Sequence, residues 1–155
     1  MELHEVYDSL EKELYDQSEV ELVLLKGHLI LEQAINQHLL LYIESKKSLD
    51  ALNLMFAKKV DLLVALEGSQ PSAWQEYVPY IKRINSIRNK LAHQLNFDDY
   101  HDDLKAWACD VVGYTPKTLN RQTTYRNTVA KAFCFLVGFL VGVCAIRQEV
   151  ASIKI

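Results

Sequence analysis

Apolar side chains recur every three or four residues along most of the chain, the spacing that places them on one face of an α-helix. This pattern predicts helices throughout, and no segment alternates apolar and polar residues as a half-buried strand does. The helices are expected over residues 3–14, 18–45, 54–67, 79–95, 98–113 and 124–150. Short connections between them favour an all-α, up-and-down bundle of five to six helices, forming one domain over residues 1–155.

Turn-forming and capping residues set the predicted helix ends. Gly68 and Gly113 are expected to end helices, because glycine adopts the left-handed backbone conformation without strain. Side chains that accept hydrogen bonds from free backbone donors begin helices, and proline suits a first turn. The predicted starts are Ser18 with Glu21, Asn53, Ser72 with Gln75, Pro79, Asp98 with Asp99, and Thr124.

The composition is that of a soluble globular domain, with 50% apolar and 24% charged residues. A net charge of −3 gives no general attraction to nucleic acid, so such binding would need a local basic patch. Three cysteines, Cys109, Cys134 and Cys144, lack the spacing of metal ligands. We interpret them as reduced residues of a cytoplasmic protein.

One apolar segment raises the question of a membrane. The first residues lack the basic start and apolar stretch of a secretion signal. Residues 132–146, however, form a run of 15 without a polar side chain. A spanning helix needs about 20 apolar residues, so we interpret the run as a buried central helix and keep a membrane helix as the alternative. Gly138 and Gly142 predict close packing of this helix, within one subunit or across a dimer.

The helix expected over residues 79–95 carries the most distinctive polar residues. At about 100° per residue, its apolar side chains form one stripe and a polar face lies opposite. The stripe is made of Tyr77, Tyr80, Ile84, Ile87, Leu91 and Leu95, and the polar face of Lys82, Ser86, Asn89 and His93. Asn89 lies one turn before His93 and can orient its imidazole, and Arg88 lies at the border of the stripe. A cation beside an oriented imidazole is the minimum for metal-free cleavage of a phosphodiester.

The segment Arg88-Asn89-Lys90-Leu91-Ala92-His93 resembles the Arg-x4-His motif of HEPN domains, including the polar residue after the arginine and the small residue before the histidine. Residues 29–35 and 56–63 are similar to the corresponding helices of that family, particularly to its branch of mannitol operon repressor-like proteins. The resemblance covers roughly residues 18–112. It implies a helical fold and a homodimer that joins two copies of the motif.

Many HEPN domains are metal-independent endoribonucleases, and the resemblance implies roles for three residues here. His93 would take the proton from a ribose 2′-hydroxyl, Arg88 would stabilise the pentavalent phosphorus, and Asn89 would orient the site, leaving a 2′,3′-cyclic phosphate. No metal or cofactor is implied. A cognate antitoxin or regulatory protein would be a partner, and Leu95 replaces the tyrosine that some nucleotidyltransferase antitoxins modify. Other members, including the repressor-like branch, are not established nucleases, so a non-catalytic regulatory or interaction protein that binds a partner or nucleotide in the same groove is the alternative.

Each of these residues also has a purely structural interpretation. Residues five apart on a helix point about 140° away from each other, so Arg88 could form a buried ion pair and His93 could lie on the surface. Glu32 is either a partner of Arg88, a carboxylate behind the site, or a satisfied core residue.

The remaining polar candidates are just as open from sequence alone. Lys82, Arg83 and Lys90 are candidates for an RNA-binding surface, although solvated helix faces look the same. His28 and His38 are interpreted as structural or exposed, because no third ligand accompanies His28 and Glu32.

Overall fold

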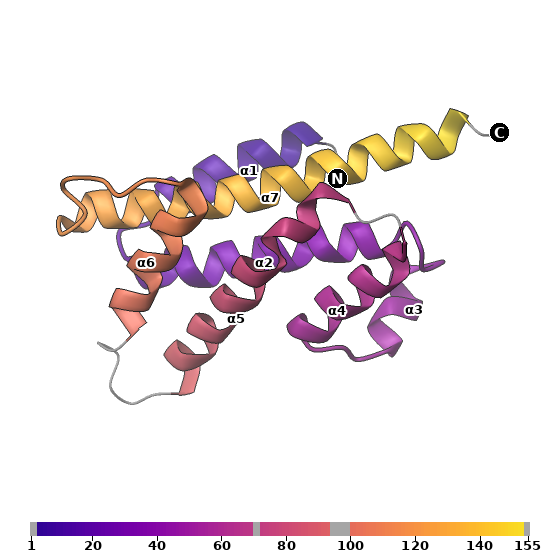
Figure 1. Cartoon of the computed structure of the whole chain (residues 1–155), viewed down its shortest axis with the longest axis horizontal. Coiled ribbons are helices and arrows are strands. Elements are labelled where there is room, and N and C mark those ends of the chain that lie inside the picture. Colours follow the sequence, from indigo (N-terminus) through magenta and orange to yellow (C-terminus); the bar gives the residue numbers. More distant parts are fainter. Residues whose placement is uncertain (1–2, 70–71, 94–99, 154–155) are drawn as a thin grey trace.

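The computed structural model describes residues 3–69, 72–93 and 100–153, and every regular element in these ranges is helical (Figure 1). This confirms the predicted all-α bundle. The elements are α1 (Leu3–Tyr15), α2 (Val20–Leu39), α3 (Lys46–Ala51), α4 (Phe56–Glu67), the 3-10 helix η1 (Ala73–Tyr77), α5 (Val78–His93), α6 (Tyr100–Val112) and α7 (Gln122–Ile153).

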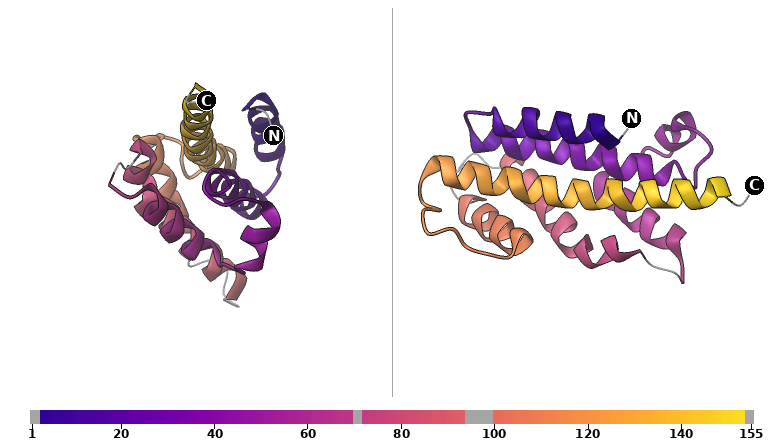
Figure 2. Two further views of the ribbon diagram at one scale, coloured as in Figure 1. Left: turned by 90° about the vertical axis from the view of Figure 1, so that its right-hand side faces the viewer. Right: turned by 90° about the horizontal axis from the view of Figure 1, so that it is seen from above.

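The two longest helices form the centre of the bundle. α2 and α7 run side by side, with α1 packed against both (Figures 1 and 2). α4, α5 and α6 form a layer on the other side of α2, in which each helix contacts the next. The groove described below therefore lies between this layer and the central helix.

Close contact between α2 and α7 depends on Gly27. A Cβ atom added at this position would overlap the ring of Phe133, which is fully buried. The ring of Phe133 also lies 5.0 Å from that of Trp107 on α6, so three helices meet there. The missing side chain at position 27 thus allows an aromatic residue to fill the centre of the core.

Among the described helices, α7 is the one whose length and composition would allow it to cross a membrane. Its apolar run also supplies core residues, since Phe133, Leu136, Val137 and Leu140 are buried against the neighbouring helices. Gly142 makes no close contact with the described residues, because an added Cβ would meet none of their atoms within 4 Å. The predicted central helix is confirmed, while packing of Gly142 across a dimer stays a prediction.

The structure has more helices than predicted because the segment after Leu39 does not continue α2. Leu41 and Tyr42 donate to His38 and Leu39, which tightens the last turn, and the helix ends there instead of near residue 45. Ser45 then starts α3, with its side chain accepting a hydrogen bond from the Ser48 N–H at 3.2 Å.

Several predicted helix starts are wrong. Asn53 has a φ of 48° and follows α3, a left-handed conformation that asparagine tolerates, and Met55 precedes α4. Glu19, not Ser18, precedes α2, and α7 begins at Gln122, before Thr124. Ser72 precedes η1 but makes no side-chain cap, because its hydroxyl donates to Glu67.

The other helix ends agree with the prediction. Gly68 and Gly113 follow α4 and α6 with positive φ angles of 62° and 83°. Pro79 lies in the first turn of α5, where its missing N–H costs nothing. Leu95, Asp98 and Asp99 lie outside the described residues.

Candidate functional site

A groove runs between α2, α4 and α5, with a volume of about 570 Å³. Its lining combines apolar and polar side chains, and α2 contributes both kinds. The apolar lining comes from Leu25, Leu29, Leu54, Met55, Phe56 and Ala57, and the polar lining from His28, Glu32, Asn85, Arg88 and Asn89. Three of the residues singled out from the sequence, Glu32, Arg88 and Asn89, are therefore brought together.

Arg88 is the one arginine or lysine of α5 that has no carboxylate partner within the described residues. Its side chain is half-buried, and its Nη1 donates to Asn89 Oδ1 at 3.2 Å. The other three basic side chains of the helix are ion-paired: Lys82 with Asp61 at 2.5 Å, Arg83 with Asp110 at 2.7 Å and Lys90 with Asp103 at 2.8 Å. An unpaired guanidinium in a groove is a ready site for an anion.

The same ion pairs bear on the predicted RNA-binding surface. Lys82, Arg83 and Lys90 are accessible, but each charge is offset by a neighbouring carboxylate. To contact a phosphate they would first have to exchange these partners, which costs part of the gain. Within the described ranges no carboxylate competes in this way for Arg88, so it is the basic side chain of α5 that can contact a phosphate without exchanging an ion pair.

His93 lies away from the groove in the single chain. It is the last residue of α5 and is exposed, and it does not belong to the groove lining. This follows from the angular offset of about 140° between positions five apart on a helix. The structure of the single chain therefore does not place Arg88 and His93 in one groove, and a second copy of the chain is one way to bring them to the same phosphate.

Glu32 lines the groove but does not pair with Arg88. Its carboxylate accepts from Lys59 Nζ at 2.7 Å, and both side chains are mostly buried, with exposures of 27% and 15%. The ion pair joins α2 to α4, and its Glu32 side chain lines the groove. The suggested Arg88–Glu32 pair is thus not formed, and no other described carboxylate pairs with the guanidinium.

His28 is a groove residue that the sequence interpretation underrated. Its side chain is 5% exposed, its ring lies 4.3 Å from that of Phe56, and its Nε2 is 3.0 Å from Asn85 Oδ1. Burial lowers the pKa of His28, the hydrogen bond that it donates to Asn85 opposes the shift, and the charge of Arg88 adds to it. His28 and Glu32 on one helix face were the available signal, but nothing in the sequence placed them beside Arg88.

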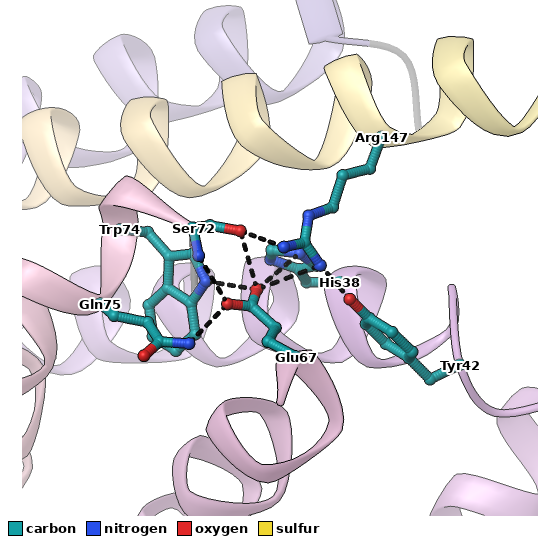
Figure 3. Close-up of polar contacts among 7 residues, drawn as sticks. All are labelled: His38, Tyr42, Glu67, Ser72, Trp74, Gln75 and Arg147. Atoms are coloured by element: carbon teal, nitrogen blue, oxygen red, sulfur yellow. Dashed lines mark hydrogen bonds and ion pairs between the residues drawn. The ribbon is translucent and has the colours of Figure 1, made fainter. Parts of the chain in front are cut away.

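A second polar cluster lies in the interior between α2, α4, η1 and α7 (Figure 3). At its centre is Glu67, whose side chain is fully buried. The carboxylate accepts hydrogen bonds from Trp74 Nε1 at 2.6 Å, Gln75 Nε2 at 2.7 Å, and the N–H and hydroxyl of Ser72 at 3.1 Å. Arg147 Nη1 lies 3.3 Å from Oε1, so one carboxylate ties three parts of the chain together.

The cluster keeps its acid charged and its histidine neutral. Burial raises the pKa of Glu67, but the hydrogen bonds from Trp74, Gln75 and Ser72 outweigh it, and the net pKa is lowered. Burial lowers the pKa of His38 to about 4, although Glu67 lies 3.5 Å from its Nε2. Arg147 also contacts Ser72 and Tyr42 through its other donors. The structural interpretation of His38 fits this position.

The Glu67 cluster was not predicted as a unit, because its members are far apart in sequence. The local signal, Ser72 followed by Gln75, was read as a helix cap, whereas both side chains turn back to Glu67. The cluster holds the end of α4 against α7. We therefore interpret it as a stabilising contact and take the Arg88 groove as the candidate site.

Within the described part of the chain, no three His, Cys, Asp or Glu side chains come close enough to hold a metal ion. Searches against family models, curated proteins and solved structures find no match to this chain.

Proposed function

We propose that the protein is an HEPN-like, metal-independent endoribonuclease that acts as a homodimer. Arg88 binds the scissile phosphate in the groove, and His93 from a second copy of the chain exchanges a proton with the RNA. Asn89 holds the guanidinium from the same helix. The products are a 2′,3′-cyclic phosphate and a 5′-hydroxyl.

The observation that supports this proposal most strongly is that Arg88 is not ion-paired. Its guanidinium lines the groove without a carboxylate partner in the described ranges, while Lys82, Arg83 and Lys90 on the same helix are all paired. An unpaired arginine at a groove favours a bound phosphate over an ion pair inside the protein. The apolar side chains that line the same groove, Met55 and Phe56 among them, would contact a base.

The proposal is tested by incubating the purified protein with mixed RNA in a chelator. We expect cleavage that persists without divalent ions and falls by about 100-fold or more in both Arg88→Gln and His93→Ala. Lys131→Gln is the matched control, because Lys131 contacts Tyr114 outside the groove. Absence of cleavage by the unaltered protein, or equal cleavage by Arg88→Gln, would refute the proposal.

One observation favours a second candidate of a different class. Because His93 does not line the groove of a single chain, the groove suits a regulatory protein that binds a phosphate-bearing ligand without cleaving it. Fluorescence-detected RNA binding separates the two. Binding that depends on Arg88, with no cleavage and no effect of His93→Ala, would support the regulatory protein.

A further inference from the structure

His28 is the imidazole that shares the groove with Arg88 in one chain. Both side chains line the groove, and the charge of Arg88 is felt at the His28 ring. Asn85, one turn before Arg88 and Asn89 on α5, fixes the imidazole by accepting a hydrogen bond from Nε2 at 3.0 Å. Phe56 packs against the ring at 4.3 Å, so its orientation is set from two helices.

We propose that His28 is the general base of the cleavage reaction and that His93 is the general acid. The assignment rests on the proposed function, since it names the proton-transfer groups of the same site. Cleavage of a phosphodiester by a neighbouring hydroxyl needs both groups, one to accept a proton and one to donate it. The resemblance to HEPN domains implied only His93, in the role of base.

The tautomer of His28 suits a base. Because Nε2–H donates to Asn85, the lone pair lies on Nδ1, which has no hydrogen-bond partner in the described residues. Burial lowers the pKa of this imidazole, so it is neutral at pH 7 and able to accept a proton. The charged groups facing it are Glu32 on α2, Arg88 on α5 and, paired with Glu32, Lys59 on α4.

In the proposed step, the 2′-hydroxyl gives its proton to His28 Nδ1 while its oxygen bonds to phosphorus. The bond from phosphorus to the 5′-oxygen breaks, and that oxygen takes a proton from the His93 imidazolium. Arg88 stabilises the charge on the non-bridging oxygens. Exchange with solvent then restores both imidazoles.

The experiment uses the full chain and an RNA that the protein cleaves, made in two forms. In the second form, sulfur replaces the leaving 5′-oxygen, and a thiolate leaves without needing an acid. We expect His28→Gln to lose about 100-fold or more on both substrates, because it lacks the base. His93→Ala should lose as much on ordinary RNA but regain activity to within about five-fold of the unaltered protein on the sulfur substrate.

Glutamine at position 28 can keep the hydrogen bond to Asn85, which limits any structural effect of His28→Gln. A second variant separates a catalytic role of His28 from a packing role. Asn85→Asp places a carboxylate on Nε2 and stabilises the imidazolium. The ascending limb of the pH–rate profile should move up by about one pH unit. A packing role would lower the rate without moving this limb.

Three results would overturn the assignment. His28→Gln cleaving both substrates like the unaltered protein would remove His28 while leaving the proposed function intact. Recovery of His28→Gln, but not of His93→Ala, on the sulfur substrate would exchange the two roles. Failure of the unaltered protein to cleave either substrate would contradict the proposed function and this inference together.

Discussion

Replacing Glu67 with glutamine removes a negative charge from the fully buried carboxylate that joins α4, η1 and α7. Each oxygen of Glu67 now accepts two hydrogen bonds: Oε1 from Trp74 and the Ser72 hydroxyl, and Oε2 from Gln75 and the Ser72 N–H. A glutamine amide has one oxygen and one NH₂ group. Two donors therefore face a donor, whichever way the new side chain turns.

The expected loss follows from this count. A buried donor left without a partner costs about 1–3 kcal/mol, and Gln75 can rotate its own amide to recover one bond. Arg147 is 26% exposed, so solvent offsets part of its lost ion pair. The sum is a decrease of about 2–4 kcal/mol in the free energy of unfolding, or about 4–16 °C in Tm for a chain of this length.

Urea unfolding followed by circular dichroism at pH 7 measures this quantity. Glu149→Gln is the matched control, because it makes the same change at an exposed position of α7 and should stay within about 0.5 kcal/mol of the unaltered protein. Since the pKa of Glu67 is lowered in the fold, the stability it supplies is lost as pH falls below the usual value of 4.5. The difference in unfolding free energy between the unaltered protein and Glu67→Gln should then become smaller. Equal unfolding free energies at pH 7 would refute the assignment of the Glu67 cluster to stability.

Three further outcomes follow from the core. Gly27→Ala should destabilise the protein by about 1–3 kcal/mol, because its Cβ would overlap Phe133. Gly142→Ala, whose Cβ would meet none of the described atoms, should stabilise it slightly because alanine favours a helix. Chemical denaturation of the two variants measures both changes in unfolding free energy. The pKa of His38 is about 4 in the fold and 6.5 when unfolded, so the free energy of unfolding should fall by about 3 kcal/mol between pH 6.5 and pH 4. A His38→Leu variant whose free energy of unfolding fell equally over this pH range would show that His38 is not the cause. Burial raises the pKa of Cys134 to about 11, so iodoacetamide at pH 7.5 should modify this thiol much more slowly than free cysteine, as mass spectrometry of the modified peptide would report.

The sequence predicted those features that depend on local physics. Gly68 and Gly113 ended helices because only the local backbone conformation matters there. The apolar run was predicted to form a central helix, and it lies in α7, which packs along α2. The helix starts predicted at Asn53 and Thr124 were wrong. Both residue types can cap a helix, but the packing of neighbouring segments determines where the helix begins.

The candidate groove could be predicted only in part. Arg88 and Asn89 stood out because the motif lies within one helix turn and a half. The position of His28 depends on how α2 crosses α5, which no local pattern encodes. The pairing of Glu32 with Lys59 instead of Arg88 depends likewise on the placement of α4. Contacts between distant helices thus determined which of several plausible polar residues share one site.

The central claim is that Arg88 of one chain and His93 of another complete a nuclease site, and mixing two inactive variants tests it most directly. Arg88→Gln and His93→Ala, unfolded together and refolded, would give mixed dimers in half of the molecules, each with one intact site. We predict recovery of about one quarter of the activity of the unaltered protein in chelator. A mixture no more active than the separate variants, although mixed dimers have formed, would contradict the account.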